Sequence, residues 1–298
     1  MKIAVTGGTG FIGQYLLRRA DEEHEFVALT AREPRKEWIK NPYVTYVRGE
    51  YNYENFLNFT RGGYDAIVHL GAMRPFPEAE KSFTNYFPSI ESSKQLFEAA
   101  RDNGIYNIIN ISSRSVYDDT IPVPYSEDGP TAPLNYYGAA KLAVEDTARI
   151  FNHKYGMKIK SLRLGPVFGL GDRPGYIPMV FLEKCLRHEK LSVYGKGQAG
   201  KEYVYVKDIV RAILTAIEKK DLNGIYNIGT GILTTNRELA ETYCRVFDNP
   251  QGYELLVDKP EIVTRYYMNV EKAKRELGYE TIYSLEQGLQ DMKKMLNM

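Results

Sequence analysis

The segment KIAVTGGTGFIGQYLL, residues 2–17, decides the fold. It starts with a short β-branched run that is typical of a strand and ends in a helical pattern. Gly7, Gly10 and Gly13 lie between the two at G-x-x-G-x-x-G spacing. Glycine permits a tight turn and a close approach of the backbone to a ligand, and a helix that follows such a loop points its N-terminus at phosphate groups. The segment therefore predicts a dinucleotide-binding loop.

The rest of the first 165 residues repeats this alternation of short β-branched runs and longer helical patterns. Such alternation predicts parallel strands joined by right-handed crossovers, hence an α/β fold with a Rossmann-type doubly wound parallel sheet. The regular pattern fades after KIKSLRLGPVFG and returns in KDIVRAILTAIEK and GIYNIGTG. We expect a dinucleotide-binding domain of residues 1–168 and 206–230, and a smaller C-terminal substrate-binding lobe of residues 169–205 and 231–298.

The composition bears on which kinds of partner the protein binds. Lys and Arg number 39 against 38 Asp and Glu in a chain of 298 residues, and the charges are mixed along it, so nothing favours nucleic acid or a membrane surface. Neither a stretch of 18 apolar residues nor a secretory signal pattern is found, so we expect a cytoplasmic protein. We also expect no metal site and no disulfide framework, because ligand and pairing spacings are absent among Cys185, Cys244, His24, His69, His153 and His188.

The end of the second expected strand, in FVALTARE, bears on the choice of dinucleotide. Enzymes that select NAD usually present an acidic side chain to the adenosine ribose about 20 residues past the glycine loop. This chain has Thr30 and Arg32 there, with Arg35 and Lys36 close behind. An arginine suits a 2′-phosphate, so the sequence favours NADP without excluding NAD. The alternative is that Arg32 is only a surface residue in a polar loop.

A tyrosine and a lysine stand out in PLNYYGAAKLAVED, residues 133–146. Tyr137 and Lys141 are four residues apart and so share one face of the expected helix, whereas Tyr136 does not share that face. A phenol is a poor base at neutral pH, but a nearby lysine ammonium and a nicotinamide cation would stabilise the phenolate. Tyr137 is therefore a candidate acid/base, and Tyr136 is expected to be a packing residue or a substrate-side contact.

Three serines lie upstream of this helix, in NIINISSRSVY. Ser112, Ser113 and Ser115 fall at the end of an expected strand in the same half of the sheet. Ligands sit at the carboxyl ends of the strands in open α/β folds, so these serines are expected to lie near the tyrosine.

Seven sequence blocks follow one another in the order of a known family. They are TGGTGFIG, DAIVHLGA, Asn85 in SFTNYF, ISSRSVY, YYGAAK, LSVYGKGQAGKEYVYVKDIV and NVEKAKRELGY. Through these blocks nearly all of the chain resembles the extended short-chain dehydrogenases/reductases that act on nucleotide sugars. The resemblance implies an NAD(P)-dependent enzyme with Ser113 as the catalytic serine, Tyr137 as the acid/base and Lys141 as its partner.

The resemblance and the glycine loop together give the expected site. The cofactor-binding residues are expected to be Gly7, Gly10, Phe11, Ile12, Gly13, Thr30, Arg32, Leu70, Gly71, Ala72, Arg74, Asn85, Tyr137 and Lys141. The substrate-binding residues are expected to be Ser113, Ser115, Lys201 and Arg265. The implied substrate is a nucleoside diphosphate sugar.

The two residues after Ser113 divide the family by reaction. The 4,6-dehydratases carry Asp-Glu at these two positions. At the second position the decarboxylating relatives carry a glutamate, and the 3,5-epimerase/reductases carry a cysteine. This chain has Arg114 and Ser115. The reactions left are 4-epimerisation, which the SRSVY pattern favours, and reduction of a 4-keto sugar by NADPH, which Arg32 favours. A sensor that binds NADP without catalysis is a third alternative, but it would not need Ser113, Tyr137 and Lys141.

Substrate handling is where the chain departs most from the family. Pro166 takes the place of an asparagine that normally contacts the substrate phosphates, and Lys201 takes the place of an arginine. Arg265 is the expected further partner of the diphosphate, ahead of Lys259. The alternative is that Lys201 and Arg265 are solvated charges on the surface of the lobe.

Residues 90–101 and 138–151 are two helical segments with apolar stripes, and in the family that the chain resembles two such helices often pair across a dimer. The resemblance therefore implies a homodimer, and the alternative is that these helices only cover the sheet.

Overall fold

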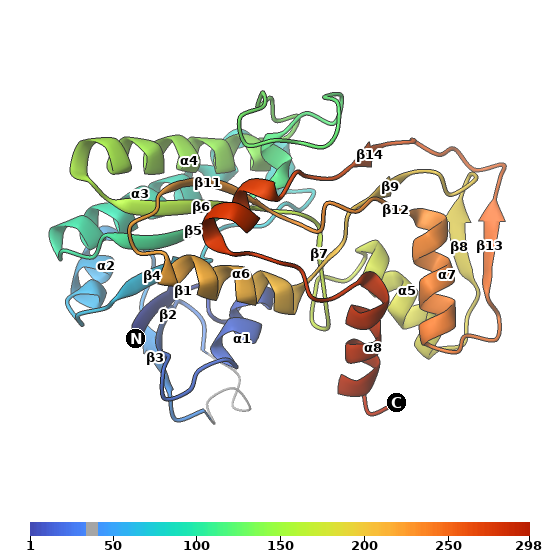
Figure 1. Ribbon diagram of the computed structural model, residues 1–298, viewed down its shortest axis with the longest axis horizontal. Coiled ribbons are helices and arrows are strands. Elements are labelled where there is room, and N and C mark those ends of the chain that lie inside the picture. Colours follow the sequence, from blue (N-terminus) through green and yellow to red (C-terminus); the bar gives the residue numbers. More distant parts are fainter. Residues whose placement is uncertain (34–40) are drawn as a thin grey trace.

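A computed structural model describes residues 1–33 and 41–298. Its centre is a seven-stranded sheet in the order β11-β6-β5-β4-β1-β2-β3, in which every neighbouring pair is parallel (Figure 1). This is the Rossmann-type sheet that the sequence predicts. The strands are β1 (Lys2–Thr6), β2 (Glu25–Thr30), β3 (Val44–Arg48), β4 (Ala66–His69), β5 (Asn107–Ser113), β6 (Lys158–Leu164) and β11 (Gly224–Ile228).

The strand order reverses at β1, which pairs with both β2 and β4. Ile3 lies opposite Phe26 on one side and Ala66 on the other. A reversal of this kind leaves a crevice beyond the carboxyl ends of the two central strands, and this is where ligands bind in open α/β sheets. Residues of the expected site directly follow β1 and β4 and lie at the end of β5, so they lie at this crevice.

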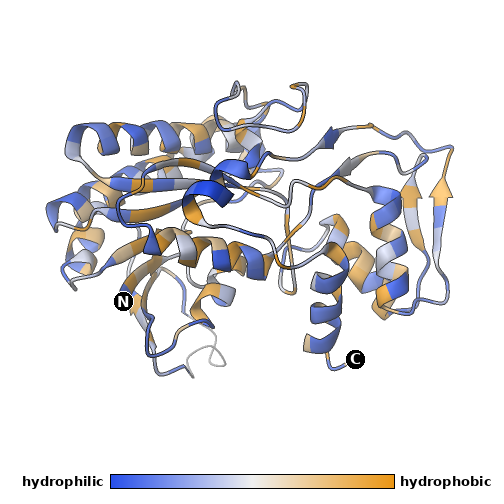
Figure 2. Cartoon of the chain, in the orientation of Figure 1, coloured by the Kyte–Doolittle hydropathy of each residue, from blue (hydrophilic) through white to orange (hydrophobic). Residues whose placement is uncertain are grey.

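Alternation along the strands supplies two apolar layers. Ile3 and Val5 belong to one buried cluster and Ala4 to the other, because successive side chains of a strand point to opposite faces. Figure 2 shows the apolar colour gathered in the central strands. Helices α2 (Tyr53–Thr60), α3 (Phe87–Asp102) and α4 (Tyr136–Tyr155) pack on the face of Ala4, and α1 (Phe11–Leu17) and α6 (Val206–Glu218) pack on the other.

The remaining elements lie mostly beyond β6 and toward the C-terminus, and α5, α7, α8, β8 and β13 gather at the right of the sheet in Figure 1. The short helical turns near the site are η2 (Ala79–Lys81), η3 (Phe83–Tyr86) and η4 (Arg114–Val116). The other elements are β7 (Val167–Phe168), α5 (Ile177–Leu186), β8 (Leu191–Tyr194), β9 (Gly200–Lys201), β10 (Val204–Tyr205), β12 (Thr234–Thr235), α7 (Asn236–Val246), β13 (Tyr253–Leu256), β14 (Arg265–Tyr266), the π-helical turn η5 (Ala273–Leu277) and α8 (Leu285–Met295). The division into two domains at the residues given above stays a prediction.

The structure also bears on a membrane span and on a metal site. Within residues 1–33 and 41–298, no helix combines the length and apolarity that a membrane crossing requires. The same residues hold no group of three or more His, Cys, Asp and Glu side chains arranged for a metal ion. Helices α3 and α4 pack on each other within one chain, and their pairing across a homodimer stays a prediction.

Candidate active site

A cavity of about 950 Å³ runs along the carboxyl ends of the central strands. It begins at the glycine loop, passes the ends of β4, β5 and β6, and reaches Lys201 and Tyr266 at its far end. The expected site residues on its wall are Gly7, Gly10, Phe11, Ile12, Gly13, Thr30, Arg32, Leu70, Gly71, Ala72, Arg74, Ser113, Ser115, Tyr137, Lys141 and Lys201. The fold therefore brings together into one cavity residues that are nearly 200 positions apart in the sequence.

The glycine loop has the close packing that a dinucleotide cradle needs. Gly7 has φ of 73°, and a Cβ there would lie 2.7 Å from the backbone nitrogen of Gly71. A Cβ on Gly13 would lie 2.4 Å from the Gly7 carbonyl oxygen, so neither position accepts a side chain. The loop thus lies flat against the end of β4 and leaves the cavity beside it open, a shape that fits a dinucleotide cofactor.

Tyr51 is a cavity residue that sequence reasoning missed. Its hydroxyl accepts a hydrogen bond from the Gly7 backbone N–H at 2.6 Å and donates one to the Leu29 carbonyl oxygen at 3.2 Å. It therefore fixes the glycine loop to the end of β2. The cavity wall there includes Thr30 and the exposed Arg32. Arg35 and Lys36, the other basic residues noted in the sequence, lie outside the described residues.

Tyr137 reaches the cavity because two side-chain hydrogen-bond acceptors and one glycine fix the start of α4. The Asn135 side chain caps the helix by accepting from the Gly138 N–H at 2.7 Å, and Glu80 accepts from the Tyr137 N–H at 3.2 Å. A Cβ on Gly138 would lie only 2.0 Å from the Ser115 carbonyl oxygen. Only glycine lets α4 approach η4 this closely, and the approach brings Tyr137 beside Ser113.

The environment of the Tyr137 phenol combines burial with positive charge. Burial raises its pKa, whereas a hydrogen bond with Ser113 and the charges of Arg74 and Arg173 lower it. The sequence assigned the lowering to Lys141. In the structure the Lys141 ammonium lies 5.8 Å from the centre of the Tyr137 ring and donates to the Ile111 carbonyl oxygen at 2.7 Å. Arg74 and Arg173 thus favour the phenolate, and the partnership expected of Lys141 stays a prediction.

Lys141 itself is held in the interior. Burial lowers its pKa to about 8, and the charge of Glu145, one turn further along α4, raises it in part. Its ammonium is fixed to the end of β5, the strand that also carries Ser113. The end of β5 thus fixes the positions of both Lys141 and Ser113.

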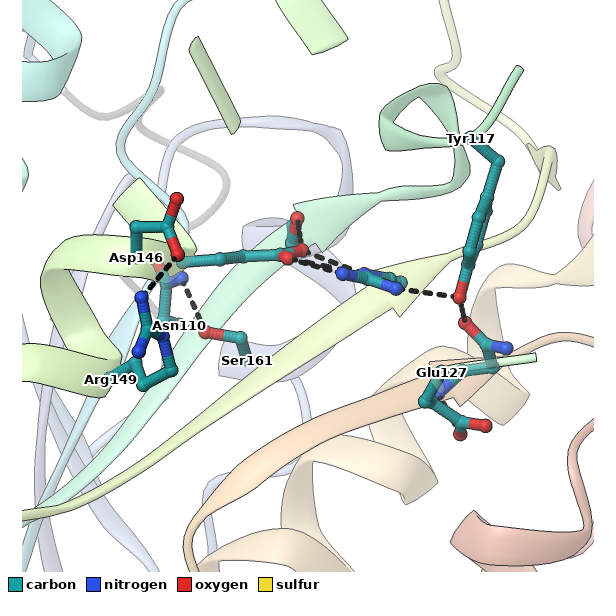
Figure 3. A network of polar contacts seen from close by, with 10 residues as sticks. Asn110, Tyr117, Glu127, Asp146, Arg149 and Ser161 are labelled. Atoms are coloured by element: carbon teal, nitrogen blue, oxygen red, sulfur yellow. Dashed lines mark hydrogen bonds and ion pairs between the residues drawn. The ribbon is translucent and has the colours of Figure 1, made fainter. Parts of the chain in front are cut away.

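A buried polar network lies next to the end of β5 (Figure 3). Glu145 accepts hydrogen bonds from Ser112 and from Arg163, whose Nη2 lies 2.7 Å from Oε2 of Glu145. Arg163 also donates to the Tyr117 hydroxyl at 2.7 Å, and Tyr117 donates to Asn227 at 2.8 Å. Arg163 and Glu145 are each 2% exposed, so the pair is desolvated and depends on this full set of partners. The network joins β5, α4, β6 and β11 directly beneath the catalytic candidates, and sequence spacing gave no signal of it.

The far end of the cavity is rich in cations. Arg173 lies in the glycine-rich loop after β7, and its Nη1 donates to the Pro75 carbonyl oxygen at 3.2 Å. Burial and the charges of Arg114 and Arg173 lower the pKa of Lys201 to about 8. Pro166 lines the cavity as expected, and its carbonyl oxygen accepts from the Val204 N–H at 2.9 Å. Arg114 and Arg173 are binding candidates that the sequence did not identify as such.

Two expected site residues do not line the cavity. The exposed Asn85 donates its amide to the Glu78 and Ala79 carbonyl oxygens, which stabilises the turns η2 and η3. The exposed Arg265 donates its Nε to the Gln198 carbonyl oxygen at 3.0 Å. Sequence blocks give the order of residues but not the direction of a side chain, and the binding roles expected of both residues stay predictions. Tyr136 also stays outside the cavity and stacks on Phe83.

Comparison with known proteins identifies the family. A model of the NAD dependent epimerase/dehydratase family matches residues 3–229. The chain belongs to this family. The solved structure of UDP-N-acetylglucosamine 4-epimerase from Bacillus cereus is 28% identical to it, covers 100% of both chains and gives a TM-score of 0.89. Family membership confirms the resemblance to extended short-chain dehydrogenases/reductases and makes the protein an enzyme of this group.

Two further proteins resemble the chain over nearly its whole length. UDP-glucuronic acid 4-epimerase from Bacillus cereus, solved with UDP-glucuronic acid and NAD, is 25% identical, covers 99% of this chain and 100% of that one, and gives a TM-score of 0.85. The putative UDP-glucose 4-epimerase of Methanocaldococcus jannaschii is 27% identical over 96% of this chain and 95% of its own length. The similar proteins thus include UDP-sugar 4-epimerases.

Proposed function

We propose that the protein is a nucleotide-sugar 4-epimerase that uses a bound nicotinamide cofactor and Tyr137 as its acid/base. The observation that carries the proposal is the meeting of Ser113, Tyr137 and Lys141 on the wall of one cavity with the glycine loop. The similar UDP-sugar 4-epimerases support the same reaction. A sensor without catalysis would gain nothing from this arrangement.

Tyr137 and Ser113 would handle the oxygen on C4 of the sugar. Ser113 hydrogen-bonds this oxygen and orients it, while Tyr137 takes the hydroxyl proton as C4 loses its hydride and becomes a ketone. The proton returns from Tyr137 when hydride returns to the opposite face of C4, so atoms and electrons balance and only the configuration changes. Arg74 and Arg173 assist because their charges favour the phenolate. The nicotinamide cofactor supplies the hydride acceptor and donor for these steps.

The residues for holding that cofactor form one side of the cavity. The loop from Gly7 to Gly13 fits the pyrophosphate, with Arg74 as a further cation. Lys141 would hold the nicotinamide ribose. Thr30 and Arg32, on the cavity wall at the end of β2, would contact the adenosine ribose.

The substrate would occupy the other side, with its diphosphate near Lys201 and Arg173. Pro166 offers no donor there, so these cations replace the missing asparagine. Asn85 and Arg265 are not needed in this arrangement. The substrate-binding lobe of residues 169–205 and 231–298 remains part of the proposal, because it supplies both cations.

A second candidate is a reductase that uses NADPH to reduce a nucleotide-4-keto sugar. One observation favours it: Arg32 lies on the cavity wall at the end of β2, where it suits a 2′-phosphate. The two candidates differ in how they hold the cofactor. Mass analysis of the nucleotide released by denaturing the purified protein separates them, because retained NAD supports the epimerase and an empty site that binds NADPH supports the reductase.

The substitution Tyr137→Phe tests the proposed chemistry. We expect turnover of a UDP-sugar at C4 to fall at least about a hundredfold, because the phenol is the only proton carrier assigned, while dinucleotide affinity is unchanged. Tyr136→Phe is the matched control, since Tyr136 precedes Tyr137 and stacks outside the cavity. Turnover of Tyr137→Phe close to that of the control would remove tyrosine catalysis from the proposal.

A further inference from the structure

Arg114 occupies a position that the proposed reaction does not use. It directly follows Ser113, begins the turn η4 and lines the cavity between Ser113 and Ser115. Its side chain is only 18% exposed. A cation that is mostly removed from water is costly unless it has partners, so its position in the cavity needs an explanation.

The guanidinium is held in a defined place. It lies 3.9 Å from the centre of the Tyr266 ring and forms an ion pair with Asp119. A guanidinium carries five N–H donors, so contacts with one ring and one carboxylate do not exhaust it. Arg114 is therefore fixed in direction and can still bind an anion in the cavity.

The charge balance of the cavity lining also favours an anion. Arg32, Arg74, Arg114, Lys141, Arg173 and Lys201 all line the cavity, whereas Asp172 is the single carboxylate among its described lining residues. Asp172 lies 3.5 Å from Arg74 and so is already paired. Arg114 and Arg173 lie close enough to Lys201 to lower its pKa, which shows three cations converging at the substrate end.

The place of Arg114 along the chain points to the sugar. In the proposed function Ser113 and Tyr137 fix the oxygen on C4, and the next residue along η4 is Arg114. A side chain there is suited to the substituents on the carbons beside C4, namely C3 and C5. A hydroxyl on C3 or a hydroxymethyl group on C5 needs no charge, whereas a carboxylate matches the two-pronged geometry of a guanidinium.

We propose that Arg114 is a specificity-determining residue that binds a carboxylate on the sugar, so that the preferred substrate is a nucleoside diphosphate uronic acid or another sugar that carries a carboxylate beside C4. This inference rests on the proposed function. It assigns the diphosphate to Lys201 and Arg173 and the sugar carboxylate to Arg114.

Steady-state kinetics with defined UDP-sugars tests the assignment. We expect the wild type to prefer UDP-glucuronate over UDP-glucose and UDP-N-acetylglucosamine by about tenfold or more in kcat/KM. Arg114→Met should lower kcat/KM for UDP-glucuronate about ten- to a hundredfold and leave the neutral sugars and the affinity for UDP unchanged. Preference for UDP-N-acetylmuramate instead, with the same loss, would place the bound carboxylate on the C3 side and still support the proposal.

Two further variants keep the test clear. Arg114→Lys keeps the charge without the fork and should show an intermediate loss, which covers the case in which Arg114→Met does not fold. Arg149→Met removes an exposed arginine on the outer side of α4, paired with Asp146 (Figure 3), and should match the wild type.

The opposing outcomes are distinct. If Arg114→Met weakens UDP and all UDP-sugars alike, Arg114 serves the diphosphate and the proposal is overturned while the epimerase survives. A wild type that epimerises only neutral sugars overturns it as well. A wild type that epimerises no sugar of either class overturns the proposed function itself, and the inference with it.

Discussion

Replacing Gly138 with alanine tests whether the close packing of α4 on η4 sets the catalytic geometry. A Cβ at this position would lie 2.0 Å from the Ser115 carbonyl oxygen and 2.9 Å from the Cβ of Pro133. An ordinary contact needs 3.4 Å, so the helix and the Ser115 backbone would have to separate by about 1.4 Å. Because Tyr137 precedes Gly138 and Ser113 is two residues before Ser115, the separation acts on the Tyr137–Ser113 pair.

The expected result is a large loss of turnover with a moderate loss of stability. A misplacement of about 1 Å can lower the rate about a hundredfold, so we expect kcat of Gly138→Ala to fall about ten- to a hundredfold. Overpacking costs about 1–3 kcal/mol in the free energy of unfolding. The assays are C4 epimerisation of a UDP-sugar and urea denaturation, with cofactor affinity measured by titration.

A matched control separates displacement from loss of stability. In Gly288→Ala, on α8, the new Cβ would lie 2.6 Å from the Phe168 ring, and neither residue lines the cavity. We expect this variant to lose stability while its kcat stays unchanged. If Gly138→Ala folds and keeps the wild-type kcat, the contact between α4 and η4 does not set the catalytic geometry and the reasoning is refuted.

Two further predictions concern charges. The pKa of Lys201 is lowered to about 8, so its charge is present below that pH and lost above it. The dissociation constant of UDP should therefore rise above about pH 8 in the wild type but not in Lys201→Arg. Parallel rises in the two proteins would exclude Lys201 from the diphosphate site. Glu145→Gln leaves Arg163 buried without a carboxylate and should lower the free energy of unfolding by about 3–5 kcal/mol in urea denaturation. The double variant Glu145→Met/Arg163→Met should recover most of that loss, and an equal loss in both variants would contradict the account of this ion pair.

The sequence predicted the parts of the site that depend on local pattern. The glycine loop needs glycine at fixed spacing because a Cβ at Gly7 or Gly13 would meet backbone, and this constraint is visible in the sequence itself. The spacing of Tyr137 and Lys141 likewise follows from one helical turn. The direction of the Asn85 side chain could not be predicted, because an exposed amide takes whichever local carbonyl its turn presents.

The residues that were missed depend on contacts between distant segments. Arg173 stands 99 positions after Arg74, and Tyr51 stands 44 positions after Gly7, so no local pattern connects them. Both lie on the cavity wall because the sheet brings the ends of separate strands together. Their roles follow from charge and hydrogen bonding across the fold.

The sequence by itself determined the doubly wound sheet and the glycine loop, and it named Ser113, Tyr137 and Lys141 as catalytic candidates, because strand alternation, turns and helical spacing are properties of neighbouring residues. The tertiary structure decided which charges act on them. It placed Arg74 and Arg173 near the Tyr137 phenol, fixed Lys141 to the end of β5 and held Arg114 against Tyr266 beside Ser113. Electrostatic effects depend on distance and burial in space, and these arise only when remote segments fold against one another.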